Sequence, residues 1–390
     1  MSSLICLDHN ANTYVYNNVR KEMNKLYKDM SMGNASSKHS MGEKARNVLN
    51  KSRNDIAKCF GIPSDYVTFT SGATESINMM ILGRARLVQP TDRVVFVSTR
   101  VEHPAVLNCF RYIQNNLSPQ IEVCYMDTEV GLVKGRAFRD FMKEKSKEKK
   151  IDLVSFSYVN HELGSVMSNI STMVKICHKY GALFHSDMTQ AAGKIDVSMK
   201  EIGADAISFS GHKFHGPMGV GCLLVSPEVK LQQLMFGGDQ ENKRRPGTEN
   251  VVGIFGMSLA LKMSLKHYCK MKQHYMDLYK HIKKSLDKNK INYRLNSCKN
   301  FMSSTMSLSL ANVNASELVA YLNEKHICIS RGTACKAYSK EGSNVINSLS
   351  LPPEMAEGTI RISFGENTTM QNVDQFMTHL VEFLSARKSN

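Results

Sequence analysis

Seven short apolar runs, separated by segments long enough to form helices, constrain the fold of this chain more than any other feature. They are rich in β-branched and aromatic residues and lie at residues 66–70, 93–98, 121–126, 152–159, 182–187, 206–211 and 221–226. Strands that are apolar on both sides occur mainly in parallel sheets covered by helices on both faces. The pattern predicts an α/β fold with a mostly parallel sheet, which binds its ligands at the carboxyl ends of the strands.

The rest of the chain predicts a second, smaller domain. Residues 251–289 form one long helical pattern, and the strand patterns after it lie near 291–295, 304–310, 326–330 and 359–365, with helical patterns near 315–324 and 370–386. A chain of 390 residues also exceeds one ordinary core. We therefore expect a large domain at 14–250 and a small α+β domain made of 1–13 and 251–390.

Composition argues against several classes of protein. No apolar run reaches the roughly 18 residues of a membrane span, and motifs begin at Leu7, which leaves no room for a leader, so we expect a cytoplasmic location. Ten scattered cysteines without a CxxC pair predict neither a disulfide framework nor a metal site. The net charge of +15 is concentrated at 143–150 and 262–290. We interpret it as solvated helix faces, because no nucleic-acid-binding motif accompanies it; the alternative is attraction to nucleic acid or another acidic partner.

Polar side chains follow three of the predicted strands. TFTSGATES (68–76) leads from a strand through a glycine turn into a helix, where backbone N–H groups could hold a phosphate. Asp187 ends a second strand and Gln190 follows it. Ser210 lies at the end of a third strand, and His212 and Lys213 follow in a glycine-bounded turn. A lysine at a strand end can form a Schiff base with a carbonyl cofactor, and a buried carboxylate is the partner that a pyridinium nitrogen needs.

Together these segments resemble fold-type-I pyridoxal 5′-phosphate (PLP) enzymes of aminotransferase class V, and most closely the NifS/IscS-type cysteine desulfurases. Further segments are similar to motifs of that family and occur in its order: LDHNANT (7–13), GNASSKHSMGEKA (33–45), VEHPAV (101–106), NHELG (160–164), RPGTEN (245–250), SRGTAC (330–335) and GTIRISFG (358–365). The resemblance covers nearly the whole chain. The 24 methionines, the absence of tryptophan and the divergent motifs are compatible with a parasite or large-DNA-virus version of the enzyme.

The resemblance implies PLP as the cofactor. Lys213 would bind it covalently and then move the proton of the substrate Cα, while Asp187 would pair with the pyridine nitrogen. Gln190 would bind the phenolic oxygen and His103 would stack on the ring, near His161, which stands where many members have an asparagine. The phosphate would be held by Ala73, Thr74, Ser210 and His212, with Thr248 reaching in from the second subunit of a homodimer.

The resemblance also implies L-cysteine as the substrate and Cys335 as the nucleophile. The Cys335 thiolate would take the substrate sulfur as a persulfide, release L-alanine and deliver the sulfur to an acceptor protein, for iron–sulfur cluster assembly or another use. Arg361 would clamp the substrate carboxylate, with Asn10 and Asn34 nearby. The loop at about 329–345 would carry the thiol, and its cations would favour the thiolate: Arg331, Lys336 and Lys340.

Four positions depart from the usual residues of the family, namely Asn12, Ala35, His161 and Arg331. None of them removes an indispensable group, so the enzyme interpretation stands. The short end after the last helix lacks the tail by which some members contact an iron–sulfur scaffold, which argues against that partnership. Two alternatives stay open: a selenocysteine lyase or related class V lyase, and a weakly active NifS-like protein that binds a partner through its basic surface.

Overall fold

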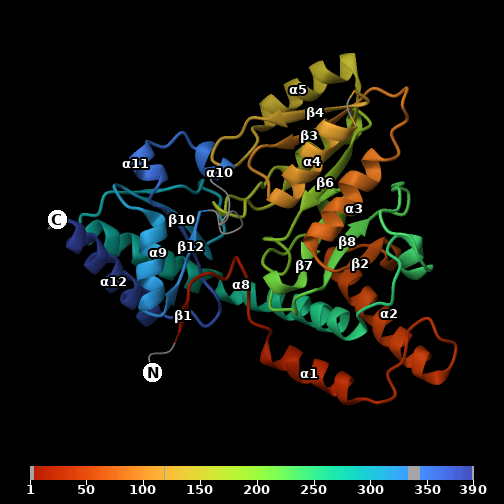
Figure 1. The fold of residues 1–390 in the computed structure, drawn as a ribbon, viewed down its shortest axis with the longest axis horizontal. Coiled ribbons are helices and arrows are strands. Elements are labelled where there is room, and N and C mark those ends of the chain that lie inside the picture. Colours follow the sequence, from red (N-terminus) through yellow and green to blue (C-terminus); the bar gives the residue numbers. More distant parts are fainter. Residues whose placement is uncertain (1–3, 118, 333–342, 389–390) are drawn as a thin grey trace.

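The largest element of the fold is a seven-stranded sheet (Figure 1). The structure, a computed structural model, describes residues 4–117, 119–332 and 343–388. The strand order is β2-β8-β7-β6-β5-β3-β4. All pairs from β7 to β4 are parallel, and β8 runs antiparallel to both of its neighbours. The α/β fold with a mostly parallel sheet is thereby confirmed. The strands are β2 (Val67–Thr70), β3 (Val94–Thr99), β4 (Ile121–Met126), β5 (Lys150–Ser157), β6 (Leu183–Asp187), β7 (Ala206–Ser210) and β8 (Gly221–Val225).

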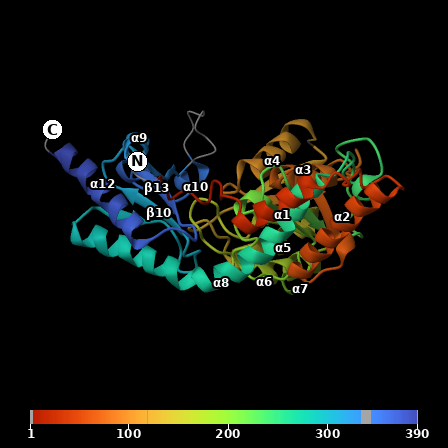
Figure 2. The same ribbon diagram turned by 90° about the horizontal axis from the view of Figure 1, so that it is seen from below.

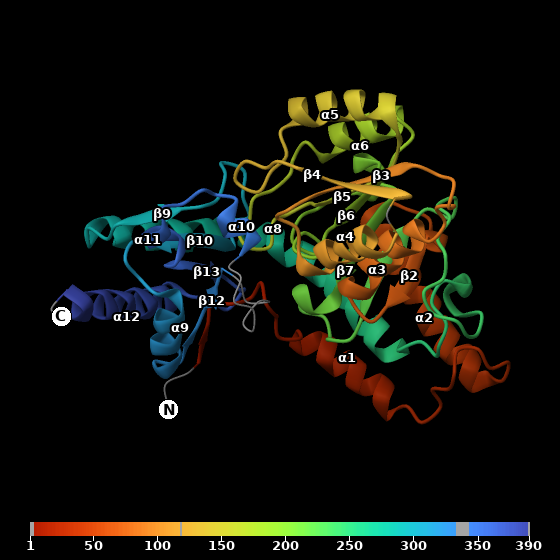
Figure 3. The same ribbon diagram turned by 45° about the horizontal axis from the view of Figure 1, so that its top comes forward.

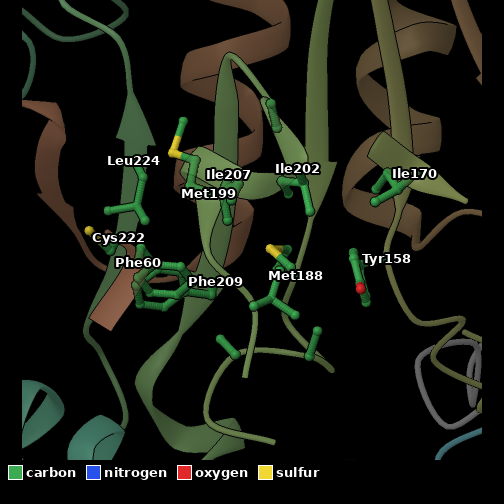
Figure 4. Packing of buried hydrophobic residues seen from close by; sticks show 14 of the residues in the cluster. Phe60, Tyr158, Ile170, Met188, Met199, Ile202, Ile207, Phe209, Cys222 and Leu224 are labelled. Atoms are coloured by element: carbon green, nitrogen blue, oxygen red, sulfur yellow. The ribbon is translucent and has the colours of Figure 1, made fainter. Parts of the chain in front are cut away.

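Helices cover both faces of this sheet, as the apolar strands require. One face packs on α3 (Ala73–Ala85) and α4 (Pro104–Asn116), where Phe96 is buried beside Phe110. On the other face, Phe60 stacks on Phe209 of β7 with ring centroids 5.3 Å apart (Figure 4). This second face is covered by α2 (Ser40–Phe60), α5 (Gly135–Glu148), α6 (Ile170–Lys179), α7 (Met199–Ile202) and the first half of α8 (Val251–Lys288). Figure 3 shows α5 and α6 lying over the strands.

Helix α8 connects two separate hydrophobic cores. Its 38 residues span about 57 Å. The first half buries Ile254 in the core of the large sheet, and the second half buries Ile282 in a second core, so α8 runs along both parts of the molecule (Figure 2). Two cores joined by one helix fit the expected two domains, whose boundaries stay a prediction.

The second core lies on a four-stranded antiparallel sheet of order β12-β13-β10-β9. Its strands are β9 (Tyr293–Leu295), β10 (Thr305–Leu310), β12 (Ser330–Arg331) and β13 (Thr359–Ser363). Helices α9 (Ala315–Glu324) and α12 (Met370–Lys388) pack on it, and β1 (Ile5–Cys6) pairs in parallel with β11 (Ile327–Cys328). The remaining helices are short or peripheral: α1 (Asn17–Lys28), α10 (Asn344–Asn347) and α11 (Pro353–Ala356).

The described residues contain neither a membrane-spanning helix nor a cluster of metal-binding side chains. Across residues 4–117, 119–332 and 343–388, no helix combines the length and apolarity needed to cross a bilayer, and no group of three or more His, Cys, Asp or Glu side chains could hold a metal ion.

Part of the basic run at 143–150 is paired within the molecule, because Lys145 and Lys149 contact Glu122 at 2.8 and 2.7 Å.

Candidate active site

A pocket of about 600 Å³ lies at the carboxyl ends of the central parallel strands. Ser157, Asp187 and Ser210 are the last residues of β5, β6 and β7, and all three line it, as expected for a parallel sheet. The small sheet contributes Arg361 of β13. Eleven of the predicted site residues line this one pocket: Asn10, Ala73, Thr74, His103, His161, Asp187, Gln190, Ser210, His212, Lys213 and Arg361.

Two predicted site residues within the described part of the chain do not line the pocket. Asn34 is exposed in the loop before α2, where its Oδ1 accepts a hydrogen bond from the Ser36 N–H at 2.9 Å. Thr248 is also exposed, in the segment before α8. Cys335 lies outside the described residues, as do Lys336 and Lys340. The predicted roles of Asn34, Thr248 and Cys335 therefore rest on the sequence.

Arg331 lies next to the segment that contains Cys335. Its side chain is exposed and lines a separate depression of about 250 Å³, together with Glu357. The preceding residue, Ser330, instead bonds Asp8 and Arg361 beside the main pocket. Neighbouring side chains of a strand point to opposite faces of its sheet. The Ser330 side chain points toward Arg361, so the Arg331 side chain points to the other face.

The start of α3 forms one end of the pocket. Its N-cap is Gly72, and no side chain caps the helix. A Cβ at Gly221 would lie 2.5 Å from Gly72 Cα, so glycine at 221 lets the turn lie directly on β8. Ser210 is adjacent, since a Cβ built at Gly72 would lie 3.4 Å from Ser210 Oγ. Uncapped N–H groups and the helix dipole suit a phosphate, so this end of the pocket fits the phosphate of PLP.

The middle of the pocket combines a buried carboxylate with a neutral imidazole. Asp187 Oδ1 accepts hydrogen bonds from the Thr189 N–H (2.9 Å) and hydroxyl (2.5 Å). His103 caps α4, with its Nδ1 accepting from the Ala105 N–H at 3.1 Å, and its ring meets His161 edge to face at 5.3 Å. Burial, reinforced by the nearby His161, lowers the pKa of His103 to about 4, so the ring is neutral at pH 7. These groups suit a protonated pyridine ring.

Lys213 follows β7 directly, in the short helix η2 (Gly211–Lys213). Its Nζ donates to the carbonyl oxygens of Asn10 (2.8 Å) and Ala11 (2.9 Å), which brings the N-terminal segment to the site. Asn12, one of the departures from the family pattern, lies with its Oδ1 3.0 Å from His212 Nδ1. Burial lowers the pKa of His212 to about 4, so this ring is also neutral at pH 7.

Arg361 is held rigidly from several sides. Only 4% of it is exposed, and its Nη2 donates to Asp8 Oδ1 (2.9 Å) and Ser330 Oγ (3.2 Å), while Nη1 donates to the His161 carbonyl (3.1 Å). Its Nε is buried and has no hydrogen-bond partner among the described residues. A fixed guanidinium that lines a pocket suits a carboxylate ligand.

Sequence reasoning assigned no role to Asp8 or Ser330, which hold Arg361, although both lie in the motifs LDHNANT and SRGTAC. It also assigned none to Lys194, whose Nζ lies 2.9 Å from Gln190 Oε1. The i, i+4 spacing of Gln190 and Lys194 was the available signal. Other pocket-lining residues without a predicted role include Glu75, Thr189 and Met218.

The fold and pocket together define a fold-type-I PLP-enzyme scaffold, and comparisons with known proteins agree. The family model for class V aminotransferases matches residues 5–376. The cysteine desulfurase IscS of Dictyoglomus turgidum is 33% identical, over 96% of this chain and 93% of that protein. A solved structure described as a NifS-like protein superimposes with a TM-score of 0.87 at 30% identity, covering 98% of this chain and all of the other.

Another solved structure, described as SspA in complex with cysteine, has a TM-score of 0.77 at 27% identity and covers 93% of this chain and 99% of that one. The chain therefore belongs to the class V aminotransferase family and, within it, to the NifS/IscS-type cysteine desulfurases.

Proposed function

We propose that this chain is a PLP-dependent cysteine desulfurase, which converts L-cysteine to L-alanine and passes the sulfur to Cys335. One observation carries the proposal: Lys213, Asp187, His103 and Arg361, the groups that this reaction needs, line a single pocket. The cysteine desulfurase relatives and the related structure that holds cysteine support L-cysteine as the substrate.

The chain's own residues fit the cofactor from phosphate to ring. When bound, PLP supplies a ring that withdraws electrons from the substrate Cα. The N-terminus of α3, with Ala73, Thr74, Ser210 and His212, would hold the phosphate. Asp187 would keep a proton on the pyridine nitrogen, and the neutral His103 would stack on the ring. Gln190 would bind the phenolic oxygen, and Lys213 Nζ would take the Cα proton and return it.

The substrate would be oriented by its carboxylate at Arg361, close to Asn10. The Cys335 thiolate then attacks the substrate sulfur: an S–S bond forms, the C–S bond breaks, and the electron pair stays with Cβ, which takes up a proton to give alanine. Described residues at both ends of the segment that contains Cys335 support this role. Ser343 Oγ donates to Glu162 Oε2 at 2.7 Å, and a Cβ at Gly332 would lie 3.5 Å from the same oxygen. Glu162 follows His161 of the pocket.

A second line of support for Cys335 comes from the other cysteines. The thiolate is the nucleophilic form of cysteine, and burial disfavours it. Of the nine described cysteines, seven have their pKa raised chiefly by burial: Cys6, Cys59, Cys109, Cys124, Cys177, Cys222 and Cys328.

We also propose a homodimer in which Thr248 of one subunit reaches the phosphate site of the other. The exposed position of Thr248 supports this arrangement, as does Arg245, which ties the same segment to the start of α3 through Glu75 at 2.9 Å. Exposed apolar side chains nearby, Met218 at the pocket and Phe236, offer surface for a partner to cover. The acceptor of the sulfur and a cytoplasmic location are proposed from the sequence alone.

The decisive assay incubates the PLP-loaded protein with L-cysteine or L-selenocysteine and measures alanine together with sulfide or selenide. The proposal expects alanine and sulfide in equal amounts from L-cysteine in the presence of a reductant. Turnover of selenocysteine alone would favour a selenocysteine lyase. A purified protein that takes up no PLP would favour the binding-protein alternative and overturn the proposal.

Arg361→Ala is expected to raise KM for L-cysteine by about ten- to a hundredfold, with a smaller change in kcat. The lost interaction is a charge-assisted hydrogen-bonded pair, which contributes about 1.5–3 kcal/mol. Steady-state alanine formation measures both constants. Arg294→Ala is the matched control, because Arg294 is exposed on β9 of the same sheet and does not line the pocket. An unchanged KM in the Arg361 variant would contradict carboxylate binding at this position.

A further inference from the structure

Lys194 is a second lysine beside the active site, and the proposed chemistry does not use it. It lies in the turn after β6, and its Nζ donates to Gln190 Oε1 at 2.9 Å and to Asn10 Oδ1 at 3.4 Å. Together with Lys213 it lines a small cavity of about 30 Å³ behind the main pocket. Lys194 as a whole residue is partly exposed. Its ammonium group is buried, and this burial is the largest cause of its lowered pKa.

The backbone places Lys194 against the cofactor lysine. Gly193 has a φ of +74°, and a Cβ there would lie 2.6 Å from Phe214 Cβ, directly after Lys213. Only glycine permits both this φ and this approach without strain. Lys194 is therefore fixed beside Lys213 by the fold rather than by a flexible surface contact.

A hydrogen-bond network joins the two lysines through Gln190 and Asn10. Gln190 Nε2 donates to the Asn10 carbonyl at 3.0 Å, and the same oxygen accepts from Lys213 Nζ at 2.8 Å. An ammonium group has only hydrogens to offer, so Lys194 must face the oxygen of the Gln190 amide. The amide NH₂ is thereby turned toward Asn10, and that contact uses one of its two hydrogens. The other is left as a donor for a ligand of the pocket that Gln190 lines.

Within the described part of the chain, Lys194 has no carboxylate partner that would stabilise its ammonium form. Among the described residues, no carboxylate oxygen lies within 4.0 Å of its Nζ. Of the described residues that line the small cavity, Glu366 is the only acidic one, and it already accepts from the Tyr14 hydroxyl (3.2 Å) and contacts His267 (3.0 Å). Burial, then the charges of Lys213 and Arg361, lower the pKa of Lys194 to about 7.

Other titratable groups around Lys194 are neutral at pH 7. Burial raises the pKa of the phenols that line the cavity, which are Tyr16, Tyr268 and Tyr275. Three imidazoles near Lys194 are kept neutral by burial. Burial lowers the pKa of each, and the charge of Lys194 lowers it further; these residues are His9, His212 and His215. The charges that lower the pKa of Lys194 are therefore those of two cations, Lys213 first and Arg361 second. Repulsion between two ammonium groups is mutual, so a protonated Lys194 favours the neutral amine at Lys213, the form that reacts with a carbonyl carbon.

We propose that Lys194 is a positioning residue of this active site, which presents the NH₂ of Gln190 to the cofactor ring and favours the nucleophilic form of Lys213. The inference rests on the proposed PLP site, but not on which amino acid the enzyme consumes. It assigns a role to the last residue of the segment HSDMTQAAGK.

The test compares Lys194→Met, which removes the charge at similar length, with Lys194→Arg, which keeps it. Lys200→Met is the control, because Lys200 is exposed on α7 nearby in the sequence. Each apoprotein is mixed with PLP at pH 7, and the rate of the absorbance change is followed. The absorbance of the loaded protein is then titrated against pH.

We expect Lys194→Met to take up PLP about tenfold more slowly and to shift the midpoint of the spectral titration upward by about one pH unit. Lys194→Arg and Lys200→Met are expected to stay near wild type. Wild-type rate and midpoint in Lys194→Met would overturn the inference. Lys194→Gln is a second neutral variant that must show the same shifts, in case the methionine variant folds poorly. A wild type that binds PLP but does not consume L-cysteine would refute the proposed substrate while leaving this test valid.

Discussion

Alanine formation from L-cysteine is expected to fall by about 10³-fold or more when Lys213 is replaced by alanine. A positioned acid–base group contributes about 10²–10⁴-fold, and the covalent link to the cofactor is lost in the same change. Lys213 lines the pocket at the end of β7, where its Nζ is held 2.8 and 2.9 Å from two carbonyl oxygens. The assay is alanine production at saturating PLP.

Two comparisons make this prediction specific. Lys200→Ala, an exposed change on α7, is expected to keep wild-type activity. Lys213→Ala is expected to lose its PLP on gel filtration more readily than wild type, because no covalent bond retains it. Near-wild-type turnover by the Lys213 variant would show that another amine serves as the cofactor lysine, and Lys194 would then be the first candidate.

Replacing Cys335 by serine is expected to reduce sulfide release by at least about 10²-fold, while the spectrum of bound PLP is retained. A hydroxyl is a far weaker nucleophile than a thiolate toward sulfur, so the C–S bond of the substrate is not broken at a useful rate. Sulfide and alanine are measured together. We expect both to fall in parallel, since one bond cleavage produces both.

The matched control for Cys335 is Cys328→Ser. Cys328 lies seven residues earlier, at the end of β11, and burial raises the pKa of its thiol. We expect this variant to keep wild-type activity. Full activity in Cys335→Ser, with loss in the Cys328 variant, would reassign the nucleophile.

The fold was predictable because continuous apolar runs in the sequence mark its buried strands, and a helical apolar pattern marks its longest helix. The run at 121–126 matches β4 (Ile121–Met126), and the long helical pattern at 251–289 became α8 (Val251–Lys288). Parallel strands then bring Asp187 and Ser210 to the same edge without further information. The eleven predicted residues that line the pocket followed from the resemblance together with this topology.

Residues that act by holding another residue were harder to predict. Asp8 and Ser330 reach Arg361 only because the N-terminal segment and β12 both lie beside β13, a tertiary contact with no periodic signal. The i, i+4 spacing of Gln190 and Lys194 could be read from the sequence. The burial of Lys194 beside Lys213 could not, because it depends on the close approach of Gly193 to Phe214. Thr248 is exposed in the single chain, and its predicted role requires a second subunit. Asn34 is exposed as well, and its predicted role near the substrate stays a prediction.

The central claim, transfer of sulfur from cysteine to this chain, is tested most directly by mass spectrometry after brief exposure of the PLP-loaded protein to L-cysteine without reductant. The account predicts that the peptide containing Cys335 gains the mass of one sulfur atom, that dithiothreitol removes it, and that Cys335→Ser gains none. Consumption of L-cysteine with no sulfur on the Cys335 peptide would contradict it.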